Sequence, residues 1–167
     1  MNSFMILIGL PGSGKSTYVV EWIKQFPETE RVSSDAFIEA EAARLGTTYN
    51  QLFPSYVKEA TKLYNKRRFE LFQQKCPRII IDRTNLTVGG RAKLLSSVPG
   101  AYYKHAIVLN PSFAEILKVN NERKQFGRDI PEDVLLKMYN TMEIDDLAAE
   151  GFDFITYQRT HEKKLTS

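Results

Sequence analysis

The sequence predicts an α/β domain in which a parallel sheet of about four or five strands is flanked by helices. Short apolar runs alternate along the 167 residues with longer segments of helical periodicity. The first apolar run ends in a cluster of glycines that opens directly into a helix. No repeat, low-complexity tract or linker divides the chain, and its length suits one domain, 1–167.

The first half of the chain contributes two strands and three helices. Phe4–Ile8 is a short apolar run bounded by a glycine and predicts a buried strand. Lys15–Phe26 has apolar residues at helical spacing and ends before a proline. A short strand end is expected at Arg31–Ser34. Two further helices are expected, one at Phe37–Leu45 that is closed by a glycine and a long amphipathic one at Ser55–Gln74.

The second half continues the alternation, which favours parallel strands covered on both faces. Strands are predicted at a β-branched run and at two later apolar runs: Arg78–Ile81, Tyr103–Leu109 and Phe152–Tyr157. Helices are predicted at Gly90–Ser97, at Ser112–Lys124 with a capping box from Ser112 to Glu115, and from Pro131 to about Asn140. A polar tail is expected at about 158–167.

The composition predicts a folded domain of the cytoplasm. Hydrophobic residues make up 43% and charged residues 26% of the chain, which excludes a disordered protein. No apolar run approaches the roughly 20 residues of a membrane helix, and no signal peptide is visible. Cys76 is the only cysteine, so an internal disulfide is impossible, which is typical of a reducing compartment.

Charge is distributed unevenly. The net charge is only +3, but Lys58–Lys75 carries six basic and two acidic residues, whereas Glu132–Asp153 carries seven acidic residues and one lysine. The asymmetry indicates that one face meets phosphates, and nucleic acid is the expected partner. On the long helix Lys58, Lys62 and Lys66 form a stripe that either follows a phosphate backbone or is a solvated face.

The glycine cluster predicts a site for a nucleoside triphosphate. Residues 9–16 fit the pattern G-x-x-x-x-G-K-[ST] in full, after a strand and before a helix. Glycines leave room for backbone N–H groups to surround a phosphate, here those of Gly9, Gly12, Ser13 and Gly14. Lys15 can reach the β and γ phosphates, and the Ser16 hydroxyl can bind Mg²⁺. The motif alone does not separate a kinase from a motor or a switch.

Two acidic positions follow predicted strands. Asp82 ends the run of three isoleucines and can hold Mg²⁺ through water, or it caps a turn. Thr84 and Asn85 offer a hydroxyl and an amide to the same crevice, or they form a local turn. Asp35 follows a strand expected to lie beside the strand that precedes the glycines. It can take a proton from an acceptor hydroxyl, or it is the N-cap of the next helix.

A basic segment at about 121–131 is predicted to act as a lid. Arg123, Lys124 and Arg128 surround Gly127 between two predicted helices. Mobile arginines that close over the phosphates can neutralise charge in a transition state, whereas the alternative is a solvated basic turn.

Together these segments resemble the P-loop 5′-hydroxyl polynucleotide kinases, and especially the phage-type kinase domain without a phosphatase domain. The resemblance rests on the order and spacing of four motifs between Met5 and about Asp153: GLPGSGKST, SSD, IIIDRTN and NNERKQFGRDIPEDVLLKMYNTM. It implies that Lys15, Ser16 and Thr17 bind ATP and Mg²⁺, that Asp35 is the general base, and that Asp82 to Asn85 line the metal and acceptor side. It also implies that Arg123 and Arg128 clamp the donor phosphates. The expected location of the protein is the cytoplasm, which is that of the host if the chain is phage-encoded.

The acceptor is the open part of this hypothesis. The family has a basic residue three positions after the aspartate, where this chain has Ile38. The principal expectation is transfer of the γ-phosphate of ATP to the 5′-OH end of DNA or RNA. The alternatives are another hydroxyl, on a hydroxymethylated base, a nucleoside or a small molecule, and an ATP-hydrolysing switch or ATP-binding partner module.

Overall fold

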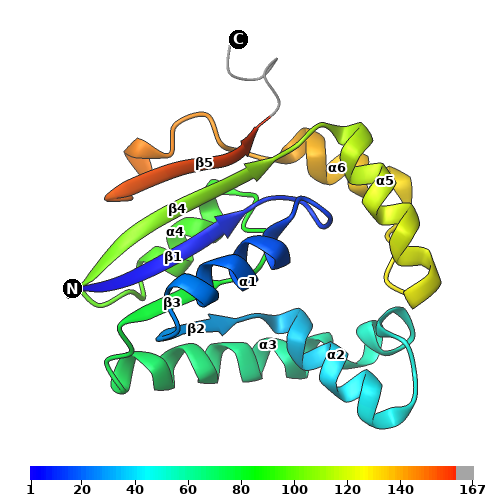
Figure 1. Cartoon of the computed structure of the whole chain (residues 1–167), viewed down its shortest axis with the longest axis horizontal. Helices are drawn as coiled ribbons and strands as arrows, with labels where there is room; N and C mark the ends of the chain where they lie inside the picture. The colour runs from blue at the N-terminus through cyan, green and yellow to red at the C-terminus, as the bar shows by residue number, and fades with distance from the viewer. Residues whose placement is uncertain (161–167) are drawn as a thin grey trace.

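A five-stranded parallel sheet forms the centre of the molecule in the computed structural model, which describes residues 1–160 (Figure 1). The strands lie in the order β2-β3-β1-β4-β5, and all four pairings are parallel. Their bounds are Asn2–Ile8 (β1), Thr29–Val32 (β2), Arg78–Ile81 (β3), Tyr102–Asn110 (β4) and Phe154–Thr160 (β5). The carboxyl ends of the strands therefore meet at one edge of the sheet.

The position of β2 corrects one expectation. The strand before Asp35 was expected beside β1, but β3 lies between them and β2 forms the edge of the sheet. Ile79, Ile80 and Ile81 of β3 are fully buried, as an interior strand requires, whereas Glu30 and Arg31 of β2 are exposed. Burial on both faces thus decides which strand is interior.

Helices cover both faces of the sheet, as predicted. On one face α1 (Lys15–Gln25) packs Val19 against Met5, Leu7 and Ile80. On the other face α3 (Tyr49–Gln73) and α4 (Val88–Leu95) contribute Tyr64, Leu71, Leu94 and Leu95 to the larger core. None of the helices within residues 1–160 is long and apolar enough to cross a membrane.

The segment predicted as a lid joins two helices at the carboxyl edge of the sheet. α5 (Phe113–Arg123) runs into the 3-10 turn Lys124–Phe126, and α6 (Glu132–Thr141) follows (Figure 1). Ile116 of α5 and Leu135 of α6 form a small core with Leu10 of the glycine-rich loop. This core fixes the two helices to the loop that they adjoin.

Several boundaries differ from those predicted. α2 (Ser34–Leu45) starts three residues early because Ser33 is its N-cap and accepts a hydrogen bond from the backbone of Ala36. α3 starts six residues early because Thr48 and Gln51 form a capping box, and Pro54 lies inside the helix. β5 extends to Thr160 and so includes the first residues of the expected polar tail. Residues 161–167 lie outside the described part of the chain.

Candidate active site

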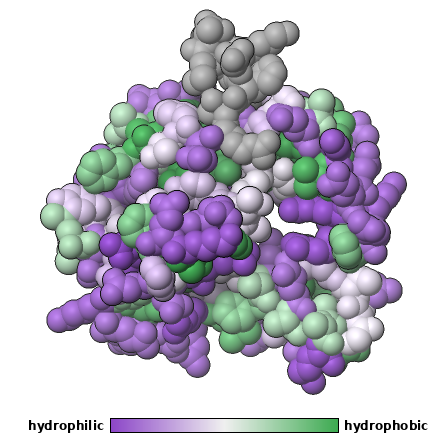
Figure 2. Space-filling model, in the orientation of Figure 1, coloured by the Kyte–Doolittle hydropathy of each residue, from purple (hydrophilic) through white to green (hydrophobic). Residues whose placement is uncertain are grey.

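A cleft of about 230 Å³ opens at the carboxyl edge of the sheet and brings most of the predicted site residues together. Figure 2 shows a hollow between the surface over α5 and the surface over α2, with hydrophilic side chains around it. The predicted residues that line the cleft are Gly12, Gly14, Lys15, Ser16, Thr17, Asp35, Asp82, Thr84, Arg123 and Arg128. Gly9 and Ser13 belong to the loop but do not line the cleft, and they lie close to each other. Asn85 lines a neighbouring cavity.

The glycine-rich loop has the geometry of a phosphate cradle. A Cβ atom at Gly9 would lie 2.5 Å from Oγ of Ser13 and 2.6 Å from the carbonyl oxygen of Leu109, so only glycine fits there. Gly12 and Gly14 have φ angles of 85° and 98°, which favour glycine. Gly14 is also the N-cap of α1, so the positive end of this helix faces the loop.

The side-chain amine of Lys15 contacts the backbone of this loop. Nζ donates hydrogen bonds to the carbonyl oxygens of Gly9 at 3.0 Å and of Leu10 at 2.8 Å. Burial lowers the pKa of the Lys15 ammonium to about 8, although the charges of Asp82 and Asp35 oppose the shift. The amine is thus poised to exchange carbonyl partners for the stronger charge of a phosphate.

The loop and its surroundings fit ATP and Mg²⁺. Ser16 and Thr17 present exposed hydroxyls in the first turn of α1. Asp82 is 6% exposed, and its Oδ2 accepts a 2.8 Å hydrogen bond from Nε of Arg31 and forms an ion pair with Nη2 of the same residue at 2.6 Å. The other carboxylate oxygen is outside this ion pair. Within residues 1–160 no group of three acidic, histidine or cysteine side chains can hold a metal ion, so a Mg²⁺ ion here would depend on Ser16, Asp82 and phosphate oxygens.

Asp35 lies on the first turn of α2 and its carboxylate is held from one side. Tyr49 donates a 2.7 Å hydrogen bond to Oδ1 of Asp35. Burial and this hydrogen bond raise the pKa of the Tyr49 phenol, so the phenol stays a donor at neutral pH. Ser33, rather than Asp35, caps α2, so the capping alternative for Asp35 is excluded.

The two predicted lid arginines lie in different environments. Arg128 forms an ion pair with Glu39 at 2.6 Å, and its guanidinium lies 4.9 Å from the centre of the Tyr49 ring. Arg123 lines the same cleft but forms no ion pair within residues 1–160. Burial and the nearby Arg128 lower the pKa of Arg123, yet a guanidinium remains charged at neutral pH. Of the two predicted lid arginines, Arg123 is therefore the one that has no carboxylate partner among residues 1–160.

Thr84 and Asn85 belong to the segment that joins β3 to α4. The backbone N–H of Gly9 donates to the Thr84 carbonyl, and Nδ2 of Asn85 donates to the Leu7 carbonyl at 2.8 Å. Asn85 has a φ of 48°, a conformation that asparagine tolerates better than most residues. The amide nitrogen of Asn85 is thus used to fix the loop, as in the turn alternative.

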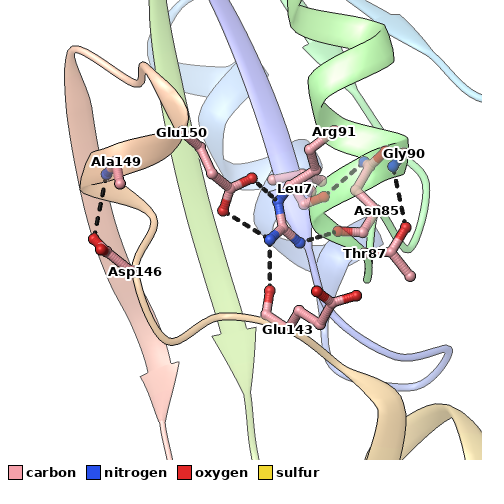
Figure 3. Close-up of polar contacts among 9 residues, drawn as sticks. All are labelled: Leu7, Asn85, Thr87, Gly90, Arg91, Glu143, Asp146, Ala149 and Glu150. Carbon is pink, nitrogen blue, oxygen red and sulfur yellow. Dashed lines mark hydrogen bonds and ion pairs between the residues drawn. The ribbon is translucent and has the colours of Figure 1, made fainter.

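A buried arginine fixes this segment from behind (Figure 3). Arg91 of α4 is fully buried and forms an ion pair with Glu150 in which Nε and Nη2 each lie 2.8 Å from a carboxylate oxygen. Its Nη1 donates to the carbonyl of Asn85, and Nη2 also donates to the carbonyl of Glu143. Arg91 thereby ties the loop after β3 to the segment between α6 and β5.

Sequence reasoning missed four residues that organise the site: Arg31, Glu39, Tyr49 and Arg91. Each acts through a partner that is distant in the chain or on another element, so no local pattern marks it. Tyr49 carried one weak signal, since Thr48 and Gln51 fit a capping box that would have moved the start of α3 to include it.

The parallel sheet, the glycine-rich loop at its carboxyl edge and the adjoining lid helices define a P-loop, nucleotide-binding domain of the kinase type. The chain belongs to the family described as AAA domain, whose model matches residues 4–144. This assignment agrees with the P-loop kinase domain that the sequence predicts.

Solved structures with the same fold include enzymes of several kinds. A chain of the Pnkp1/Rnl/Hen1 RNA repair complex is 24% identical with a TM-score of 0.69; the match covers 84% of this chain and 43% of that one. A candidate kinase from Chloroflexus aurantiacus is 18% identical, with a TM-score of 0.68 and coverage of 95% and 89%. Shikimate kinase from Acinetobacter baumannii is 14% identical, with a TM-score of 0.60 and coverage of 99% and 89%. The chain thus spans less than half the length of the first of these proteins.

Proposed function

We propose that this domain is an ATP-dependent kinase that transfers the γ-phosphate of ATP to a hydroxyl of nucleic acid, namely the 5′-OH end of DNA or RNA. One observation carries the proposal: Asp35, oriented by Tyr49, lines the same cleft as Lys15 and Arg123. A carboxylate beside a phosphate cradle suits phosphoryl transfer to a hydroxyl.

The glycine-rich loop and Lys15 hold the donor. Backbone N–H groups of residues 12–17 surround the β-phosphate, and the Lys15 ammonium leaves the carbonyls of Gly9 and Leu10 to contact the β and γ phosphates. Ser16 and Asp82 would hold Mg²⁺, which would supply charge neutralisation at the phosphates. Arg31 keeps the Asp82 carboxylate in place through its two contacts.

Asp35 serves the acceptor. Tyr49 occupies Oδ1, which leaves Oδ2 of Asp35 to accept the proton of the attacking hydroxyl. The acceptor oxygen forms a bond to the γ-phosphorus while the bond from this phosphorus to the bridging oxygen of ADP breaks. The proton goes to Asp35, and the products are a phosphomonoester and ADP.

The lid arginines stabilise the transferring phosphoryl group. Arg123 is the first candidate, because it has a charge in the cleft with no carboxylate partner among the described residues. Arg128 contributes only after it exchanges Glu39 for a phosphate oxygen. Neutralisation of the equatorial oxygens by such cations is a large part of catalysis in this reaction class.

Nucleic acid as acceptor is supported by the motifs shared with polynucleotide kinases and by the basic stretch Lys58–Lys75, which covers the second half of α3 and the residues just after it. The likeness to a chain of an RNA repair complex agrees with it. A second candidate is a kinase for a different hydroxyl, on a modified base, a nucleoside or a small molecule. Ile38 favours that candidate, because it is 1% exposed in the core and offers no phosphate contact.

The test is transfer of labelled γ-phosphate to four acceptors: 5′-OH DNA, 5′-OH RNA, hydroxymethylated-base duplex and free nucleosides. An Asp35→Asn protein is the matched control, with nucleotide affinity measured in parallel. Transfer to ends that Asp35→Asn abolishes, with unchanged ATP affinity, is the expected result. Transfer only to another acceptor selects the second candidate, and ATP hydrolysis with no phosphorylated product selects a switch.

A further inference from the structure

A second cavity of about 500 Å³ adjoins the cleft on the acceptor side. It lies between α3, the segment after β3 and the start of α4. Arg83 and Thr84 line both this cavity and the cleft, so the two spaces meet at these residues. A molecule whose hydroxyl reaches Asp35 has room to extend into the second cavity.

The lining of this cavity is cationic. Arg68 from α3, Arg83 from the loop after β3 and Lys93 from α4 contribute three positive charges, and none of the lining residues is acidic. These three side chains form no ion pair with any residue in 1–160. By contrast, Arg31, Arg67, Arg78, Arg91 and Arg128 all have carboxylate partners. Unpaired cations that converge on one cavity indicate an anionic ligand.

Tyr64 holds two of these cations in place. Tyr64 is 2% exposed, and the centre of its ring lies 5.3 Å from the guanidinium carbon of Arg68 and 4.8 Å from that of Arg83. Arg68 also donates a 3.4 Å hydrogen bond to the Tyr64 hydroxyl. Contacts with an aromatic ring restrict the guanidinium groups before any ligand arrives, which lowers the entropic cost of binding.

α3 carries two further exposed lysines next to residues that line the cavity. Thr61 and Asn65 line the cavity, and each is followed by an exposed lysine, Lys62 and Lys66, one position further round the helix. A ligand with several anionic groups in a row can use this surface, whereas a small acceptor with one anionic group would end in the cavity. The first arrangement is that of a nucleic acid backbone.

We infer that this cavity binds the first backbone phosphate of the acceptor strand, on the 3′ side of the nucleoside whose 5′-OH reacts. The inference rests on the proposed function and deepens it: Arg68, Arg83 and Lys93 are specificity residues for an acceptor that carries this phosphate. A nucleoside without a 3′-phosphate lacks the contact and is a poor acceptor.

The test uses two 5′-OH hexanucleotides that differ only in the first linkage, a phosphodiester in one and an uncharged methylphosphonate in the other. Arg68→Gln and Lys93→Gln, singly and together, are compared with the wild type. Both residues line the second cavity but not the ATP cleft, and Lys93 is exposed, so its substitution leaves the core intact. Lys137→Gln, at an exposed lysine of α6 outside both cavities, is the matched control.

In the wild type, kcat/KM is expected to fall about tenfold when the first linkage is neutralised. The double variant should lose about tenfold on the phosphodiester and little on the methylphosphonate, with KM for ATP unchanged. Lys137→Gln should behave as the wild type. A double variant that keeps the full preference for the charged linkage, or that loses both substrates equally, overturns the inference.

A direct binding measurement distinguishes failure of the proposed kinase function from failure of the proposed phosphate site. The affinity of each labelled hexanucleotide is measured by fluorescence anisotropy, with no ATP present. If the wild type phosphorylates neither strand but binds the charged one more tightly through Arg68 and Lys93, the kinase assignment fails and the phosphate site stands. If affinity depends on neither the linkage nor these residues, the phosphate site is wrong.

Discussion

The phenol of Tyr49 donates a 2.7 Å hydrogen bond to Oδ1 of Asp35 and thereby fixes the carboxylate that faces the phosphate cleft. The two residues come from different helices, α3 and α2. Tyr49 in turn lies against the guanidinium of Arg128 from the lid. The orientation of the proposed base thus depends on three segments that converge from different parts of the chain.

Tyr49→Phe is expected to lower kcat by about tenfold, because the ring is kept while the hydrogen bond that orients Asp35 is lost. Asp35→Asn should cost about a hundredfold or more, since it removes the proton acceptor. Nucleotide affinity should stay unchanged in both variants, as measured by calorimetry. Tyr56→Phe, on the same helix but outside the cleft, is the control; equal loss in both tyrosine variants would contradict the positioning role.

Affinity for ATP is expected to fall as pH rises above about 8. Burial sets the pKa of Lys15 near 8 in the nucleotide-free protein, and bound phosphates favour the charged amine. Above this pH binding must take up a proton, so the dissociation constant should rise, by up to about tenfold for each further pH unit. Measurements from about pH 7 to 9.5 check this. In Lys15→Gln the affinity should be weak and flat across the same range, and an equal slope in both proteins would exclude Lys15 as its origin.

Gly9→Ala is expected to weaken nucleotide binding by more than about tenfold, because the new Cβ would meet the Leu109 carbonyl at 2.6 Å and displace the loop. Gly89→Ala is a matched control in the first turn of α4, where no atom beyond the adjacent residues and the backbone of the helix itself lies within 4 Å of the added Cβ. That variant should gain about 0.5–1 kcal/mol of stability. Calorimetric titration and urea denaturation separate the two effects.

Glu39→Ala is expected to lower KM for ATP a few-fold. The substitution frees Arg128 from its 2.6 Å ion pair, so that its charge becomes available to the phosphates. Stability should change by less than about 1 kcal/mol, because the pair is partly exposed. Glu41→Ala, which breaks the exposed pair with Arg44 on the same helix, is the control and should leave KM unchanged. A higher KM in Glu39→Ala would show that Glu39 holds Arg128 in its productive position.

Arg91→Met is expected to destabilise the fold by about 3–5 kcal/mol, because it leaves Glu150, 8% exposed, buried without its partner. Arg91→Met/Glu150→Met should recover a large part of this loss, since no unpaired charge remains. Urea denaturation of the two variants, with Glu150→Met completing the cycle, gives the coupling energy. Additive losses would show that the ion pair is not the source of the effect.

The sequence was sufficient for the parts of the fold with local signals. Apolar runs identified the strands, and the glycine pattern located the loop at residues 9–16, because glycine is required there by the close approach of Leu109 and by positive φ angles. The order of the strands was less accessible. β3 lies inside the sheet because it is buried on both faces. The four residues of β2 do not by themselves contradict an interior position for β2, and only the pairing of the strands shows that β2 is the edge strand.

The contacts that complete the site depend on residues distant in the chain. Arg91 and Glu150 are 59 positions apart, and Arg31 and Asp82 are 51 apart. Neither pair has a spacing that a helix or strand would impose, so no periodicity reveals it. Arg123 and Arg128 were selected together from one basic segment, and the positions of Glu39 on α2 and Tyr49 on α3 distinguish them.

The start of α3 and the lid are joined to each other. Asn50 is the donor in three hydrogen bonds: its backbone N–H donates to the Gly127 carbonyl, and its side-chain amide donates to the carbonyl and carboxylate oxygens of Asp129, 79 residues away. These hydrogen bonds bridge the start of α3, where Tyr49 contacts Asp35, and the lid, which carries Arg123 and Arg128. Under the proposed function, a strand that enters end first would leave this bridge intact, whereas a continuous strand that approaches from the side would have to break it. For the proposed kinase, discrimination between a free terminus and the interior of a polymer would then follow from topology, set by these three hydrogen bonds rather than by recognition of any base.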